Sequence, residues 1–354
     1  MKHLYIRVSV FLVVLLAFTQ CEQQIVGPVP NFDYEFPAGG IVVEDVTLED
    51  VVPDDITPGS MNTDGQTAFG NNLANVNTNP AALAAVRDQL TALAQALSTS
   101  QKNAVKGLNV STLPTQVKSG VSDPNSNLIS LIATIQGLLK EYPQLAPLVP
   151  AITLPTGGRV LNDKGRVSEV TIPLIETQVN AVNAYEVDCE AAARRAYEIN
   201  ITKIDSAYNA QLKLVSDKNT ENINAALLVR SNGITAANTR YTDRNTLFRS
   251  QYDVFAQSIA NSTVFTPAEI ELLNILNTLI YAIDLYNSTL LLNFELAAIS
   301  NVFALNLEKA AAANTRMTND ATTKRNAAVQ EADQTLADAL FNTCHDQGGA
   351  SGGD

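Results

Sequence analysis

The feature that most constrains the fold is the absence of helix-breaking residues over two long stretches of the chain. From Leu174 to Asn261 there is no proline and a single glycine, Gly233, and from Ala268 to Cys344 there is neither residue. Proline removes a backbone donor and clashes inside a helix, and glycine costs backbone entropy there. Each stretch therefore predicts one very long helix.

A short break separates the two predicted helices. The sequence STVFTP at 262–267 supplies Thr266 as a helix N-cap and Pro267 at the first helical position, and Glu269 follows in the first turn. The pattern predicts a turn near 262–267. The segment 172–345 is then a long antiparallel helical hairpin.

The cysteines set the register of this hairpin. Cys189 and Cys344 are equidistant from the predicted turn, because the midpoint of their residue numbers falls between Thr266 and Pro267. An antiparallel helix pair brings two such positions side by side at its open end. In an exported protein a disulfide is the expected state of adjacent thiols. We predict a Cys189–Cys344 disulfide, with two unpaired buried thiols as the alternative.

Charged residues are consistent with the same register. Facing residues in an antiparallel pair have a constant sum of residue numbers, which is 533 for the two cysteines. An exposed ion pair contributes only about 0–1 kcal/mol, so such pairs would define register rather than add strength. Four pairs of opposite charge have this sum: Arg195 with Asp338, Lys213 with Asp320, Asp217 with Arg316, and Arg249 with Asp284.

The first half of the second long helix is more apolar than one buried face requires. Apolar residues occur nearly all round the helix from 270 to 307, whereas the facing segment 226–262 is much more polar. A helix that is apolar all round is normally buried on several sides. The cover is the chain's own N-terminal helices packed as a bundle, another protein or a second copy, or a lipid bilayer. The candidate interaction surface consists of Ile270, Leu273, Leu276, Ile280, Leu291 and Phe294.

The segment 79–171 combines short predicted helices with a small β-hairpin. Asn79 and Pro80 are typical of a helix start, and the apolar residues that follow recur at helical spacing. A second predicted helix begins after the sequence SDP and ends near Tyr142, before a proline-rich stretch that excludes helix. The sequence GRVLNDKGRV predicts a hairpin with its turn at 162–165.

The first 21 residues predict an export signal. Lys2 and Arg7 supply positive charge, and the apolar run at 8–18 is too short to span a bilayer. The run leads to Cys21, which resembles the lipidated N-terminal cysteine of bacterial lipoproteins. That resemblance implies a lipid anchor on Cys21, and cleavage after Cys21 by a signal peptidase is the alternative. Both interpretations predict an exported protein at the cell surface, in the outer envelope or outside the cell.

The segment 22–78 is acidic and contains ten carboxylates and no lysine or arginine. Like charges repel one another, so this tract predicts an extended spacer, with cation binding as the alternative. The formal net charge of the whole chain is −13. Nucleic-acid binding needs a basic face, and we therefore expect no nucleic-acid partner.

No motif predicts catalysis, a cofactor or a metal. The two histidines are His3, in the predicted signal, and His345, beside the tail, whereas zinc needs clustered Cys and His ligands. The sequence DPNSNL at 123–128 begins like a calcium loop, but the glycine and the bidentate glutamate of such loops are missing. We predict that the protein is not an enzyme.

Together these patterns predict a mostly α fold. It comprises a coiled-coil-like helical hairpin, additional N-terminal helices packed as a bundle, one small β-hairpin and a flexible tail at 346–354. The predicted function is that of a structural or interaction protein, such as a stalk, assembly subunit or adhesion component. We expect a protein partner or self-association and no small-molecule substrate. The alternative is a membrane-active protein that resembles helical pore-forming toxins in shape.

Overall fold

The computed structural model describes residues 40–123, 125–157 and 187–344. The predicted export signal with Cys21, the predicted β-hairpin at 162–165, His345 and the predicted tail lie outside these residues. The described chain is mostly α-helical, as predicted. By their contacts its residues divide into a first unit, with residues 40–46, 187–211 and 321–344, and a second unit, with residues 47–123, 125–157 and 212–320.

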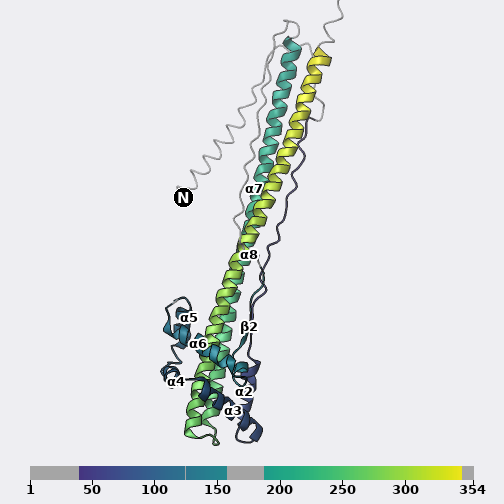
Figure 1. The fold of residues 1–354 in the computed structure, drawn as a ribbon. Coiled ribbons are helices and arrows are strands. Elements are labelled where there is room, and N and C mark those ends of the chain that lie inside the picture. Colours follow the sequence, from purple (N-terminus) through teal and green to yellow (C-terminus); the bar gives the residue numbers. More distant parts are fainter. Residues whose placement is uncertain (1–39, 124, 158–186, 345–354) are drawn as a thin grey trace, which may run out of the picture. The chain divides into compact units, whose positions relative to one another are not determined.

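Two long helices dominate the fold and pack against each other as an antiparallel hairpin (Figure 1). They are α7 at Val187–Ala260 and α8 at Pro267–Asp338, and a short π-helical segment, η2, continues α8 at Ala339–Thr343. The predicted turn is confirmed, because α7 ends and α8 begins on either side of it. The Thr266 hydroxyl accepts from the Glu269 N–H at 3.3 Å, and the Glu269 carboxylate accepts from the Thr266 N–H at 2.7 Å.

In the first unit α7 and α8 contact each other mainly through small residues. Ala193, Ala328, Ala332 and Ala339 are buried, and Ile204 is the large side chain that packs beside them. Alanine lets two helices approach closely, since no long side chain separates their backbones. The sparse apolar content explains why this unit has a thin core.

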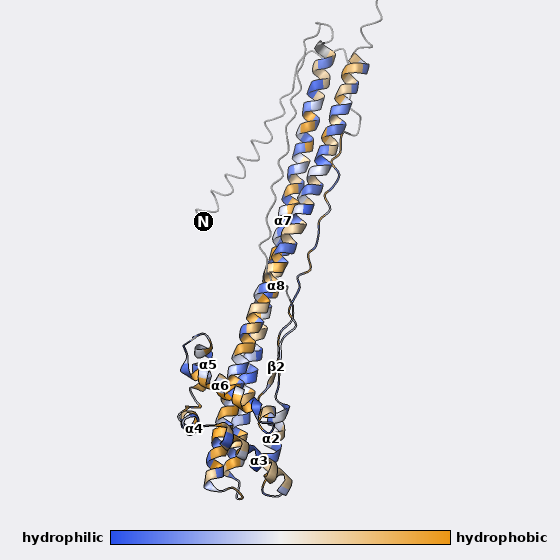
Figure 2. Ribbon diagram, in the orientation of Figure 1, coloured by the Kyte–Doolittle hydropathy of each residue, from blue (hydrophilic) through white to orange (hydrophobic). Residues whose placement is uncertain are grey.

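In the second unit five short helices gather around the part of the hairpin that contains the turn (Figure 1). The apolar first part of α8 lies among them (Figure 2). The sequence predicted two of these helices, which are α3 and α6. The helices are α2 at Asp64–Asn75, α3 at Pro80–Ala96, α4 at Thr99–Lys106, α5 at Leu113–Val121 and α6 at Asn127–Glu141, with a 3-10 turn, η1, at Ala146–Leu148.

Local capping determines where these short helices begin. The Asn79 side chain accepts from the Ala81 N–H at 3.0 Å and so caps α3, as its position before Pro80 predicts. Ser98 forms a capping box with Gln101 and starts α4. The sequence did not predict helices α2, α4 and α5. They are short, and short helices are stabilised mainly by tertiary packing, which local sequence propensity does not report.

A two-stranded antiparallel sheet joins distant parts of the second unit. Strand β1 at Ser60–Asn62 pairs with β2 at Ala151–Thr153, and Met61 lies opposite Ile152. A bridge between Thr57 and Thr156 extends the pairing. The two strands are far apart in the chain and are not joined by a tight turn, so no turn motif in the sequence predicts their pairing.

The core of the second unit is built from α8 and the helices that cover it. Its largest fully buried side chains come from α2, α3, α5, α6, η1 and both long helices. Phe69 of α2 meets Phe255 of α7 edge to face with ring centroids 5.3 Å apart. Gly65 of α2 lies directly on the backbone of η1, where a Cβ atom would overlap the Pro147 carbonyl oxygen. This close approach requires glycine.

The Gly65 contact generates a stability prediction. We expect Gly65→Ala to lower the free energy of unfolding by about 1–3 kcal/mol, because the methyl group forces α2 and η1 apart. The matched control is Gly137→Ala on α6, where a Cβ atom meets nothing within 4 Å. This control should raise the free energy of unfolding by about 0.5–1 kcal/mol. Urea unfolding followed by circular dichroism measures both, and stabilisation by both substitutions would contradict the prediction.

Candidate functional site

The predicted interaction surface is for the most part inside the protein. Leu273, Leu276, Ile280 and Leu291 are buried, and Ile270 is half-buried against the same core. The chain's own N-terminal helices cover the part from Ile270 to Ile280, in agreement with the first of the three alternatives, and Leu291 lies beside Gly59 before strand β1. These residues are therefore core residues, and their side chains are not available to a partner. Periodicity shows that a residue needs cover, but it does not identify the cover.

Part of the apolar stretch nevertheless remains uncovered. Phe294 is 44% exposed, and Leu227 and Leu228 of α7 are exposed as well. The segment Pro267–Thr343 is the one helix of the described residues that is long and apolar enough, by length and composition, to cross a membrane. Only 33% of its most apolar 18-residue window is buried.

The acidic N-terminal segment runs along the surface groove where the two long helices of the second unit meet. We call residues 47–57 the strap. Its backbone is held by two buried amide side chains, one from each helix. Asn222 of α7 accepts from the Val51 N–H and donates to the Glu49 carbonyl, both at 3.1 Å. Asn306 of α8 accepts from the Asp54 N–H and donates to the Asp54 carbonyl, both at 2.9 Å.

The spacing of these contacts shows that the strap is extended and antiparallel to α8. The Thr47 N–H donates to Asp320 at 3.0 Å, and Asp54 is bound to Asn306. Seven extended residues cover about 23 Å at 3.3 Å per residue. The fourteen helical residues between the two partners cover about 21 Å at 1.5 Å per residue. The two lengths agree, so one strap residue passes about two residues of α8.

Lysines and arginines of the long helices neutralise the strap carboxylates. Glu49 pairs with Arg316, and Asp54 pairs with Lys309, each at 2.6 Å. Asp50 pairs with Lys218. The hydrogen bond from Arg316 holds the pKa of the Glu49 carboxyl below its usual range. These pairs are exposed, and each contributes about 0–1 kcal/mol, so they favour acidic residues without dominating the binding.

The interpretation of residues 22–78 as a free spacer therefore needs correction. Residues 47–57 are extended, but they are bound to the long helices, and residues 64–75 form α2. The charge count within the segment omitted the cations on α7 and α8, which lie far away in the sequence. Residues 22–39 lie outside the described part of the chain.

The first unit binds its N-terminal residues in the same manner. Gln211 of α7 donates to the Glu44 carbonyl at 2.7 Å, and Lys324 of α8 donates to the Asp45 carbonyl at 2.5 Å. Val43 is buried against Ile204 and the alanines of α8. Here too side-chain donors recognise backbone carbonyls rather than particular side chains.

The four predicted charge pairs do not describe the contacts of these residues. Lys213 and Asp217, from two different predicted pairs, bond to each other along α7, and Arg249 pairs with Asp253 one turn away. Neighbours one turn apart are in reach without any tertiary contact, and therefore compete well with a facing helix. Among the other members, Arg195 bonds to Ala191 and Arg316 to Glu49, the Thr47 N–H is one partner of Asp320, and Gln66 bonds to Asp284. Asp338 is the last residue of α8.

One charged pair does join the long helices in the core of the second unit. The Glu295 carboxylate is fully buried and accepts two hydrogen bonds from the Arg240 guanidinium, both at 3.2 Å. Arg244, one turn along α7, donates to the Ser288 hydroxyl at 3.3 Å. Burial lowers the pKa of Arg244. A buried charge without a partner is costly, so this pair ties α7 to α8 at one register.

A second buried acid, Asp284, lies among apolar side chains and is 1% exposed. Gln66 of α2 donates to Asp284 at 2.7 Å and to the Leu148 carbonyl at 2.9 Å. Burial raises the pKa of the Asp284 carboxyl well above its usual range, and the Gln66 hydrogen bond opposes this only in part. The Gln66 carbonyl oxygen is buried and has no donor among the described residues. A protonated Asp284 carries the O–H donor that this oxygen lacks.

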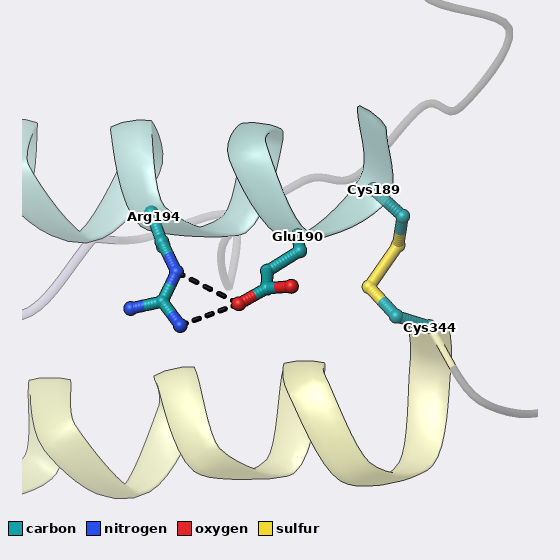
Figure 3. Close-up of a disulfide and its surroundings, with 4 residues drawn as sticks. All are labelled: Cys189, Glu190, Arg194 and Cys344. Carbon is teal, nitrogen blue, oxygen red and sulfur yellow. Dashed lines mark hydrogen bonds and ion pairs between the residues drawn. A yellow bond between two sulfur atoms is a disulfide. The ribbon is translucent and has the colours of Figure 1, made fainter. Parts of the chain in front are cut away.

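The disulfide between Cys189 and Cys344 is present, as predicted (Figure 3). The two Cα atoms are 5.8 Å apart, which is within the normal range for a disulfide, and both cysteines are buried. Arg194 and Glu190 form an ion pair on the next turn of α7. The disulfide closes the open end of the hairpin.

Other chemistry is sparse in the described residues. They contain no group of three or more His, Cys, Asp or Glu residues that could hold a metal ion. Shallow clefts of about 440 to 520 Å³ lie on either side of the α4–α5 connection. The largest of these clefts is lined mainly by apolar residues, among them Val105, Tyr252 and Ile275, with Lys106 and Glu271 also in its lining. Lys106 and Glu271 form an ion pair with each other at the exposed rim of this cleft.

Comparison with protein-family models, curated proteins and solved structures finds no match to this chain.

The buried acid generates a prediction about pH. The folded state raises the pKa of Asp284 above its unfolded value, so it favours the protonated form. The resulting stabilisation is complete below the unfolded pKa of about 3.9 and is lost as pH rises through the folded pKa. Asp284→Asn keeps a donor for Gln66 and should flatten the pH dependence of the urea midpoint. The exposed control Asp253→Asn should keep the parent slope, and an unchanged slope for Asp284→Asn would refute the assignment.

The disulfide generates a prediction about local stability. Cys344→Ala removes a cross-link of a kind that typically contributes about 2–4 kcal/mol. We expect faster hydrogen exchange in η2 and in the first turns of α7, with the exchange of α3 and α6 unchanged. Mass spectrometry after exchange measures both regions. Equal loss of protection in both regions, or no loss at all, would be inconsistent with a staple at the open end.

Proposed function

We propose that this is an exported, non-enzymatic structural or interaction protein of the cell surface or envelope, acting as a stalk, assembly subunit or adhesion component. The observation that carries the proposal is a long helical hairpin whose open end is closed by a disulfide. Disulfides persist in oxidising compartments, in agreement with the export signal predicted at the N-terminus.

The use of the chain's residues favours binding over catalysis. Helices α7 and α8 contain 74 and 72 residues, and the buried polar side chains on them contact other parts of the same chain. The clefts are shallow, and the strap occupies the groove of the second unit. A fold of this kind offers a long surface to partners and can hold them apart. It does not enclose a substrate.

Exposed apolar side chains on both long helices offer contacts for a protein partner. Phe294 is exposed on α8, and Leu227 and Leu228 are exposed on α7. Aromatic residues, phenylalanine among them, are enriched at protein interfaces. The partner surface proposed here therefore replaces the one predicted from sequence, and Phe294 is the member common to both.

A membrane-active protein is the second candidate, favoured by the length and apolar composition of α8. The buried pair of Glu295 with Arg240 lies in the same stretch, and Asn306 is buried at the end of it. Charged and amide groups are costly inside a bilayer. Insertion would also remove the strap backbone from Asn306. We therefore prefer a protein partner.

A matched pair of photo-crosslinking residues tests this function. The photoreactive side chain replaces exposed Phe294 in one variant and buried Leu291 in the other, and living cells are irradiated. We expect Phe294 to crosslink to another protein or to a second copy, and Leu291 to crosslink only within its own chain. The short distance along α8 between the two positions makes Leu291 a control for expression and location.

Two outcomes would contradict the proposal. Crosslinks from Phe294 to lipid, together with leakage of liposomes by the purified protein, would establish the membrane-active alternative. Absence of any intermolecular crosslink from Phe294 would mean that this surface has no partner.

A further inference from the structure

We propose that the groove between α7 and α8 in the second unit is a peptide-binding groove that also accepts the strap of a second copy, so that copies of the protein exchange straps. This inference rests on the proposed function as an assembly or interaction protein. It specifies a second copy as the partner and an extended acidic segment as the ligand.

Recognition of the strap is directed at its backbone. Asn222 and Asn306 each use both the oxygen and the nitrogen of the side-chain amide, and they bond only to N–H and carbonyl groups of the strap. Asp320 accepts from the Thr47 N–H in the same way. Backbone hydrogen bonds give affinity without demanding particular side chains, as in other domains that bind extended peptides. Any chain in the same extended conformation satisfies them.

The side chains of the strap add a preference for its own sequence. Ile56 packs against a cluster of buried residues that includes Tyr241, Leu292 and Ile299. Glu49, Asp50 and Asp54 pair with Arg316, Lys218 and Lys309. The groove thus combines an apolar position with a row of cations, and the strap combines isoleucine with carboxylates. A second copy carries this same combination.

The connectivity permits exchange without unfolding of the hairpin. The strap is bound by hydrogen bonds, ion pairs and packing, and no covalent bond fixes it to the groove. The turn between Ala260 and Pro267 joins the groove walls independently of the strap. On the C-terminal side of the strap, Pro58 and Gly59 lie between the Thr57 bridge and strand β1. Exchange requires the chain to open at these two residues, so that the Thr57–Thr156 bridge is released with the strap while strand β1 stays paired with β2.

Exchange therefore replaces each contact with an identical contact from another copy. Domain swapping has a low energetic cost for this reason. The balance between the strap of the same copy and that of a second copy depends on the local concentration of each. Copies concentrated on one surface would favour exchange, which links them in pairs or in a series.

Cysteine pairing between two variants tests the exchange directly. Glu49→Cys is made in an affinity-tagged chain, and Arg316→Cys is made in an untagged chain. The two full-length purified proteins are mixed and treated with a short bismaleimide. We expect a crosslinked species that contains one tagged and one untagged chain. A mixture of Glu49→Cys with Lys140→Cys, an exposed position on α6, is the matched control and should give no more than background crosslinking.

Two further variants complete the test: one carries both cysteines in one chain, and the other, Asn306→Ala, weakens the hydrogen bonds that hold the strap. Glu49→Cys combined with Arg316→Cys in one chain should crosslink within that chain, which establishes folding and reach. Asn306→Ala removes two hydrogen bonds to the strap and should speed the exchange about tenfold, the effect expected for a loss of about 1.4 kcal/mol. If Asn306→Ala leaves the exchange rate unchanged, the hydrogen bonds from Asn306 to the strap backbone are not what holds the strap in place.

The result that overturns strap exchange is efficient crosslinking within the double variant together with background crosslinking in the mixture. That result would leave the proposed function standing if Phe294 still crosslinks to a partner in cells. Conversely, exchange in the mixture without any crosslink from Phe294 would support the groove as the interaction site and reject the apolar surface. The two experiments therefore fail independently.

Discussion

The register of α7 against α8 is the constraint on which the other contacts depend. Within the first unit, Tyr197 bonds to Asp333 and Asp205 to Arg325, and the residue numbers of both pairs add up to 530. Within the second unit, the numbers of Arg240 and Glu295 add up to 535. These sums lie close to the 533 of the disulfide. A slip that separates Arg240 from Glu295 would break a buried ion pair, and loss of such a pair is strongly destabilising.

Two helices alone cannot cover a surface as apolar as the first half of α8. In the second unit α2, α3 and α6 supply a third layer over residues such as Leu273 and Leu276. The strap takes the corresponding role over the groove, where the helices present the buried amides Asn222 and Asn306 among apolar side chains such as Ile299. Extended chain suits that surface, because its free N–H and carbonyl groups satisfy the buried amides that a helix could not.

The positions of charged residues did not identify which ion pairs form. Opposite charges at the expected spacing occurred along both helices, yet the side chains of Lys213 and Arg249 bond to neighbours on the same helix. Arg316 bonds to the strap, and Asp284 bonds to Gln66. Exposed charges choose among several partners of similar energy, because each pair is worth so little. A spacing rule therefore cannot identify the pair that forms.

The sequence by itself determined the two long helices, the turn between them, the caps at Thr266 and Asn79, and the disulfide. Each follows from local chemistry or from a fixed separation along the chain: proline and glycine break helices, short polar side chains cap them, and equal arm lengths bring two cysteines together. Only the tertiary structure decided what covers α8, where the strap binds, which strands pair and which charges meet. Those outcomes depend on competition among residues distant in the sequence, and the differences between the competing contacts are small compared with the total energy of packing.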